Sequence, residues 1–155
     1  MILVWIKLCI FGAQKNTINC KNWMKIIDDS LLNEVSAKAK DSPRLRMNYN
    51  FHQSLDELCH RFLNAVEPGT EVPIHHHVTK DETFILLRGK VRVLTYNDNG
   101  EVVDEVVLSR EEGRYGVDIP KNTWHTLEAL ESSVIFEVKQ GPFVEHEVDG
   151  ILTLR

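Results

Sequence analysis

The stretch from His75 to Gly89 reads HHHVTKDETFILLRG, and it holds three of the four side chains from which we predict a metal site. The residues just before it, 72–74, are Val-Pro-Ile, so an extended run over residues 72–77 is expected. A strand sends alternate side chains to the same face, which lets His75 and His77 reach one ion. His76 then faces the other way, toward solvent or as a support for the ligands, and is not counted as a ligand.

Two more ligands are expected from neighbouring strands. A polar turn over residues 78–81 leads into the run ETFILLRG, whose first residue, Glu82, can lie beside the two histidines and add a carboxylate oxygen. His125, in a strand expected over residues 124–128, adds a third imidazole. Three imidazoles and one carboxylate suit one divalent metal ion such as Fe, Mn, Ni or Zn, and a six-coordinate ion keeps positions for water or substrate. The sequence does not distinguish among these metals.

Two blander interpretations of the same four residues stay open. The histidines can be a chance cluster in a core, or a bound metal can serve stability alone, because an open coordination position is what separates a catalytic metal from a structural one. With one carboxylate ligand, a bound dication keeps a formal charge of about +1, so it can polarise a carbonyl, acidify a water or bind an anion. Each of these possibilities leads to a different class of enzyme.

The sequence from His60 onward predicts short strands and few helices. Asn97 to Gly100 reads NDNG, which is typical of a hairpin loop because Asn and Gly tolerate the positive φ that such turns need. The fold class expected from this closely spaced pattern is mostly β, a single jelly-roll β-barrel domain with a short N-terminal helix. The strands are expected at residues 60–66, 72–77, 82–89, 90–96, 102–108, 115–119, 124–128 and 134–139.

The first part of the chain divides at Met24. Residues 1–23 begin with the apolar run MILVWIKLCIFG, which is too short to span a bilayer as a helix, and we interpret them as a poorly structured N-terminal extension upstream of the true start. Residues 24–58 are expected to hold a helix and a polar loop that pack on the barrel of residues 59–155. Asp29 or Ser30 is the expected cap, Pro43 follows the end of the helix, and the helix is expected to lie on the barrel as a lid.

The segment RLRMNYNFH, residues 44–52, is dense in polar donors and shows no strong periodicity. It is either a solvated connector or a loop that grips a substrate at the barrel mouth. In the second case Arg44 or Arg46 binds a carboxylate or phosphate, and Asn48, Tyr49 or His52 fixes hydroxyl groups. Tyr49 and His52 are also the candidate catalytic residues, because either side chain can move a proton beside a metal-stabilised oxyanion.

Composition limits the classes of protein to consider. A chain of 155 residues with 43% hydrophobic residues is long enough for one domain with a core. Its net charge of -5, with 18 Lys and Arg spread along the chain, gives no basic stripe, so we expect no nucleic-acid partner and no membrane partner. Three cysteines at no motif spacing indicate a reducing, cytoplasmic location. A homodimer through edge strands is possible by analogy with similar barrels.

The residues around the predicted ligands resemble two motifs of the cupin superfamily. Gly69, five residues, His75, one residue, His77, four residues, Glu82, six residues and Gly89 reproduce the first cupin motif without a gap. The second motif is partly kept: Pro120 and His125 stand at the corresponding offsets, while Gly113 comes one residue early, Asn122 replaces the turn glycine and Ala129 replaces an asparagine. Asn is the next-best residue for a left-handed turn, so the turn before His125 is still expected.

From Met24 onward the chain more narrowly resembles the WbuC-type cupins, a bacterial family linked to O-antigen gene clusters. The resemblance implies a cupin-fold metalloprotein of surface polysaccharide metabolism, with the four predicted ligands carried over from the motifs. One hypothesis is an enzyme that isomerises, epimerises or oxidises a small sugar or sugar nucleotide; the alternative is a metal-containing binding or sensor module for a small anion. A third possibility is a metal-free cupin whose histidines act as acid and base.

Overall fold

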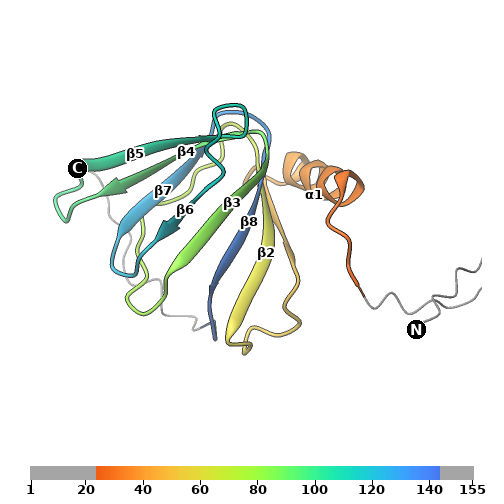
Figure 1. Ribbon diagram of the computed structural model, residues 1–155, viewed down its shortest axis with the longest axis horizontal. Helices are drawn as coiled ribbons and strands as arrows, with labels where there is room; N and C mark the ends of the chain where they lie inside the picture. Colours follow the sequence, from red (N-terminus) through yellow and green to blue (C-terminus); the bar gives the residue numbers. More distant parts are fainter. Residues whose placement is uncertain (1–23, 144–155) are drawn as a thin grey trace, which may run out of the picture.

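Two antiparallel sheets and one helix make up the computed structural model, which describes residues 24–143 (Figure 1). The expected extension over residues 1–23 lies outside the described residues. The elements are α1 (Asp29–Asp41), β1 (Arg46–Asn50), β2 (Cys59–Val66), β3 (Glu82–Arg88), β4 (Lys90–Tyr96), β5 (Val102–Ser109), β6 (Gly116–Ile119), β7 (Trp124–Ala129) and β8 (Ser133–Gln140).

The larger sheet has the strand order β1-β2-β8-β3-β6 and the smaller sheet the order β5-β4-β7. Strands distant in sequence therefore become neighbours: β2 pairs with β8 over its whole length, and β8 pairs with β3 on its other side. The predicted fold class, mostly β with a jelly-roll arrangement and one short N-terminal helix, is confirmed.

The main core lies between the two sheets. Alternate residues of β4, Val91 and Val93, turn inward and meet Phe84 and Leu86 of β3 and Ile135 of β8, all at most 5% exposed. This is the period-two alternation that a sheet with one face on a core requires. Burial of this apolar surface supplies the main driving force for closing the two sheets on each other.

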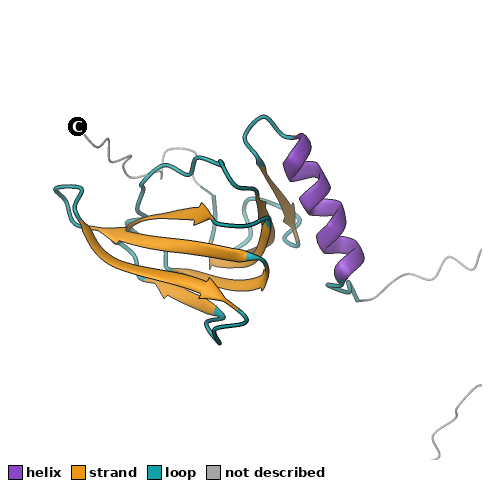
Figure 2. Cartoon of the chain, turned by 90° about the horizontal axis from the view of Figure 1, so that it is seen from above, coloured by secondary structure: helices purple, strands orange, loops and turns teal. Residues whose placement is uncertain are grey.

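Helix α1 packs on the outer face of the larger sheet, away from the smaller sheet (Figure 2). Its apolar residues, including Val35 and Ala39, are buried against Leu63, Ala65 and Val134. The side chain of Asp28 caps the helix by accepting a hydrogen bond of 3.0 Å from the N–H of Leu31, one residue before the expected cap. Because α1 covers the outer face, it does not act as a lid over the space between the sheets.

Two segments differ from the expected secondary structure. The polar segment after the helix contains β1, which pairs with β2 from Arg46↔Val66 to Asn50↔Phe62 and forms an edge of the larger sheet. Conversely, the expected strand over residues 72–77 is extended but makes only one isolated bridge, between His75 and His125. Pro73 has no N–H to donate to a ladder, which limits strand pairing in this segment.

Candidate metal centre and ligand cavity

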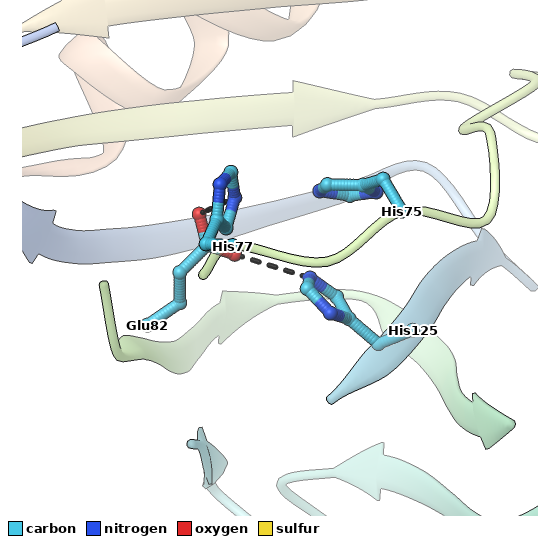
Figure 3. A group of neighbouring side chains, drawn as sticks. All are labelled: His75, His77, Glu82 and His125. Atoms are coloured by element: carbon cyan, nitrogen blue, oxygen red, sulfur yellow. Dashed lines mark hydrogen bonds and ion pairs between the residues drawn. The ribbon is translucent and has the colours of Figure 1, made fainter. Parts of the chain in front are cut away.

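The four predicted metal ligands come together between the sheets. His75 and His77 belong to the extended segment, Glu82 is the first residue of β3, and His125 is the second residue of β7. One ligand atom from each of the four lies within 4.8 Å of the others. Figure 3 shows the side chains converging on one point, with Glu82 between two of the imidazoles. Glu82 and His125 are each only 2% exposed, so the group is set into the protein and not on its surface.

Backbone bonds hold the extended segment against β7. The N–H of His75 donates to the carbonyl of His125 (3.0 Å), and the N–H of His125 donates back (2.8 Å). The N–H of Asn122 donates to the carbonyl of His77 (2.7 Å), and Asn122 has φ of 62°, so the left-handed turn expected there is present. These bonds align His75 and His77 with His125 without a continuous ladder.

Backbone carbonyl groups determine which ring nitrogen of His75 and of His125 faces the centre. The Nδ1 atom of His75 lies 2.9 Å from the carbonyl oxygen of Pro73, and that of His125 lies 2.8 Å from the carbonyl oxygen of Thr123. A carbonyl only accepts, so each Nδ1 carries the proton and each Nε2 keeps its lone pair for the centre. This is the tautomer that a metal-binding imidazole needs, and the donor set fits a divalent ion.

The carboxylate of Glu82 bridges the group. Its Oε1 lies 2.9 Å from Nε2 of His77, and its Oε2 lies 3.2 Å from Nε2 of His125. Burial works against ionisation of Glu82, but its contacts with His125 and His77 and the charge of Lys139 hold the pKa of this carboxyl well below its usual range. Burial, followed by the charge of His125, lowers the pKa of His75 to about 4, so this imidazole is neutral and ready to bind a cation at neutral pH.

A second buried carboxylate lies beside this centre on β8. The ammonium of Lys139 is 2.8 Å from Oε1 of Glu82 and 3.3 Å from Oε1 of Glu137, so one cation serves two carboxylates. Burial and the charge of Glu82 raise the pKa of Glu137 to about 7. Burial opposes the charge on Lys139, but the two carboxylates outweigh it and raise the pKa of Lys139 above its ordinary value. Lys139 therefore neutralises the ionised carboxylate of Glu82, while Glu137 is partly protonated near neutral pH.

A cavity of about 410 Å³ opens next to the four residues. This volume lies within the range of small-molecule sites. Three of the predicted ligands, His75, Glu82 and His125, lie in its wall, and no residue of α1 does. The other lining residues are Arg44, Arg46, Met47, Asn48, Phe62, Asn64, Val72, Pro73, Phe84, Leu127, Ile135, Glu137 and Lys139.

The structure separates the residues predicted for substrate contact into two groups. Arg44, Arg46 and Asn48 line the cavity; Arg46 and Asn48 are alternate residues of β1 and so share one face of the sheet. Tyr49 faces the helix side, where its ring packs edge-on against Phe51 at 5.3 Å between centroids. The catalytic role of Tyr49 stays a prediction, and its position gives that role no support.

His52 also lies away from the cavity wall. It is buried, its ring stacks on that of His60 at 4.4 Å between centroids, and its Nδ1 is 3.2 Å from both the backbone nitrogen and oxygen of Arg61. These contacts assign His52 a packing position at the start of β2. Its catalytic role, like that of Tyr49, stays a prediction without support from geometry.

Sequence reasoning missed three polar residues of the cavity wall, Asn64, Glu137 and Lys139. A signal for two of them was present in β8, which reads SVIFEVKQ. Its odd-numbered residues after Ser133 run Ile135, Glu137, Lys139, so charges stand on the same face as an apolar core residue. Charges on the inward face of a central strand indicate a site, because burial of an unpaired charge is costly.

Comparison with known families decides the membership of the chain. The model of the family described as "Domain of unknown function (DUF6016)" matches residues 27–108, which is more than half of the chain. The chain belongs to this family. The matched part of this DUF6016 protein includes His75, His77 and Glu82, while His125 follows it. No curated protein sequence matches the chain.

Solved structures similar to this DUF6016 protein share the cupin fold. A conserved protein of unknown function from Streptococcus pyogenes, SPY1581, has a TM-score of 0.53 and 13% identity over 77% of this chain and 90% of its own. KdgF from Halomonas sp. has a TM-score of 0.50 and 18% identity, covering 67% and 85%. The capsular polysaccharide assembling protein CapF from Staphylococcus aureus has a TM-score of 0.50 and 24% identity over 64% of this chain, which spans only 28% of CapF.

These likenesses establish the fold alone, and that fold is the one expected from the resemblance to cupins. They do not extend to the narrower WbuC type. Over residues 24–143, none of the helices has the length and apolar character needed to cross a bilayer.

Proposed function

We propose that this protein is a metal-dependent cupin enzyme that acts on a small anionic sugar or sugar-nucleotide-like substrate in bacterial surface polysaccharide metabolism, by isomerisation, epimerisation or oxidation. One observation carries the proposal: four metal-ligand side chains converge within 4.8 Å, and three of them line a cavity that is also lined by two arginines. A metal placed for stability alone has no need of a cavity lined by cations.

The chain's own residues prepare the centre for one divalent ion. The ion would be held by His75, His77, Glu82 and His125. The Nδ1 protons of His75 and His125 are already donated to carbonyl groups. When bound, Fe, Mn, Ni or Zn would polarise a carbonyl or hydroxyl oxygen of the substrate and stabilise the negative charge that develops there. Phe84 and Leu127 in the wall exclude water and so strengthen that interaction.

The arginine end of the cavity supports an anionic substrate. Arg46 begins the edge strand β1, and Arg44 precedes it by two residues; both line the cavity. Burial, and after it the charge of Arg44, lowers the pKa of Arg46. A carboxylate or phosphate between the two guanidinium groups would offset the burial of their charge and can accept paired hydrogen bonds. Asn48, on the same face, can bond a hydroxyl group.

The place in polysaccharide metabolism, including O-antigen assembly, is supported by the resemblance to WbuC-type cupins. CapF, named for capsular polysaccharide assembly, has a similar fold. Fold alone carries no activity, so the chemical proposal rests on the cavity and not on that likeness.

Metal content is the first test. The protein is purified without a histidine tag and without added metal, and its metals are measured by elemental analysis. About one equivalent of a transition metal is expected, and His125→Ala is expected to lose it. The matched control is His76→Ala, because His76 is adjacent to two ligands but its ring packs at a tilt against that of Trp124, 4.0 Å between centroids. Metal-free wild type that also fails to take up Fe, Mn, Ni or Zn on dialysis contradicts the proposal.

Turnover is the second test. Metal-loaded protein is incubated with a panel of sugar phosphates, sugar acids and nucleotide sugars, with product formation and thermal shift recorded together. Product that disappears in His125→Ala and persists in His76→Ala supports the enzyme. A thermal shift without product from any member of the panel overturns the enzyme and favours the alternative, a metal-containing binding or sensor module.

A further inference from the structure

Glu137 is a buried carboxylate in the cavity wall that the four-ligand centre does not use. It is 6% exposed and lies in the middle of β8. Its neighbours in register are Phe62 on β2 and Phe84 on β3. An apolar residue at this position would pack between Phe62 and Phe84, whereas a carboxylate between two phenyl rings is costly to bury. The position therefore calls for a polar partner from within the cavity.

The hydrogen bonds that Glu137 accepts leave some acceptor sites of its carboxylate unused. Its Oε1 accepts from Lys139 at 3.3 Å and its Oε2 accepts from the amide of Asn64 at 3.4 Å, both at the long end of the range. A carboxylate has about four acceptor sites, so each oxygen can accept one more donor. Lys139 makes its shorter contact, 2.8 Å, with Glu82, so Glu137 holds only a share of that ammonium.

Strand order sets Glu137 between the two ends of the cavity. Four adjacent strands, β1, β2, β8 and β3, each present a polar residue to the cavity along a diagonal of the sheet: Arg46, Asn64, Glu137 and Glu82. Neighbouring strands are about 4.8 Å apart, so Arg46 and Glu82 are separated by about 14 Å across the sheet. They are also displaced along the strands by about 20 Å, because Arg46 is level with Ser133 of β8 and Glu82 with Lys139. A ligand that joins the arginine end to the metal end must pass over Glu137.

We propose that Glu137, supported by Asn64, determines specificity by accepting hydrogen bonds from two neighbouring hydroxyl groups of the ligand. This deepens the proposed function and rests on it. The ligand class is a linear polyhydroxy anion, with its carboxylate or phosphate at Arg44 and Arg46, its hydroxyl groups at Glu137 and an oxygen at the metal end. Compact anions such as oxalate are too short to reach both ends.

The test compares matched pairs of probes. D-Gluconate is paired with hexanoate and D-glucitol 6-phosphate with hexyl phosphate, so the members of each pair share an anion and a six-carbon chain but differ in hydroxyl groups. Binding is measured by titration calorimetry with and without the metal. Wild type is expected to prefer the hydroxylated member of at least one pair by about tenfold or more.

The variants separate recognition from folding. In Glu137→Leu the ratio of the two dissociation constants within a pair is expected to fall toward one. Glu137→Gln, which keeps one acceptor, is expected to recover part of the preference. Ile135→Val, a cavity neighbour without a polar group, is expected to weaken both members of a pair alike and leave their ratio unchanged. A ratio of dissociation constants is insensitive to a general loss of folded protein, and metal content is recorded for each variant.

Three outcomes overturn this inference: no preference for hydroxylated probes in wild type, a preference that survives in Glu137→Leu, and no binding of any probe. Each is distinguishable from failure of the proposed function. A wild type that holds its metal and turns over a substrate but shows no role for Glu137 loses only this inference. A wild type without metal that still prefers the hydroxylated probes through Glu137 loses the enzyme but keeps the recognition site.

Discussion

The backbones of His75 and His125 exchange two hydrogen bonds, of 3.0 and 2.8 Å, although the residues are 50 positions apart in the sequence. This single bridge is the only strand pairing that the described residues show for the segment 72–77. The relative position of two metal ligands therefore depends on a short contact and not on a sheet. A bound ion that links His75, His77 and His125 would hold the segment in place, as a ladder of hydrogen bonds holds the paired strands elsewhere.

Metal binding is therefore expected to slow amide exchange in the segment 72–77. Removal of the metal with a chelator should speed exchange of its amides by about tenfold or more, because local opening there breaks few other contacts. Amides in the middle of β2, which is paired on both sides, should change little. Hydrogen exchange read by mass spectrometry measures both regions in one sample, and equal protection of the segment with and without metal contradicts the expectation.

The sequence predicted the metal centre better than the cavity around it. Histidines and a glutamate at fixed spacing indicate shared ligation, and the four expected ligands do lie together. The catalytic roles predicted for Tyr49 and His52 rest on their chemistry alone, within a segment that the sequence predicts to be a loop. In the structure that segment contains β1, whose alternation sends Arg46 and Asn48 to the cavity and Tyr49 to the helix side.

The alternation was visible in the sequence, since Arg46, Asn48 and Asn50 are polar while Met47 and Tyr49 are largely apolar. What the sequence did not show was the partner strand. β1 is an edge strand, and only its pairing with β2 decides which of its faces meets the cavity. Glu137 was missed for a similar reason, because its environment is set by β2 and β3, which are far from β8 in sequence.

Gly89 is expected to tolerate no side chain. It lies between β3 and β4 with φ of +82°, and a Cβ there would clash with the backbone of Ser132 and with Ser133. Gly89→Ala adds this clash to the strain of a left-handed backbone and should lower the free energy of unfolding by about 3 kcal/mol or more. Urea denaturation of the chelator-treated protein measures the change.

Gly113 provides the matched control for Gly89. It has φ of +71°, but a Cβ there meets nothing within 4 Å. Gly113→Ala should therefore cost only the backbone strain, about 1 kcal/mol. Equal losses in the two variants would show that the packing around Gly89 adds nothing.

Lys139→Met is expected to destabilise the metal-free protein. The variant leaves Glu82 and Glu137 without their shared cation, and removal of one partner from a buried ion pair costs about 3 kcal/mol. A divalent ion should restore part of the loss, since it neutralises Glu82, so the gain in melting temperature on metal addition should exceed that of wild type. The control is Lys90→Met, which breaks an exposed pair with Glu112 and should cost less than about 1 kcal/mol.

The carboxyl of Glu137 should also make stability depend on pH. Burial and the charge of Glu82 raise its pKa in the folded protein to about 7, from an ordinary value of 4.5. Between these values the folded chain holds a proton that the unfolded chain has released, so the free energy of unfolding falls as pH rises through this window and stays low above it. The contribution is fully present below the unfolded pKa and is lost at about pH 7.

Glu137→Gln isolates this contribution, because it removes the titrating group and keeps the size of the side chain. The free energy of unfolding is measured in urea for chelator-treated wild type and variant between about pH 5 and about pH 8. The value for wild type minus that for the variant should decrease by about 1–3 kcal/mol across this range. The neutral His75, whose pKa is lowered to about 4, makes stability rise with pH over part of the same range, but it does so in both proteins and cancels in the difference. A difference that is constant with pH would show that Glu137 ionises at its ordinary pKa despite its burial.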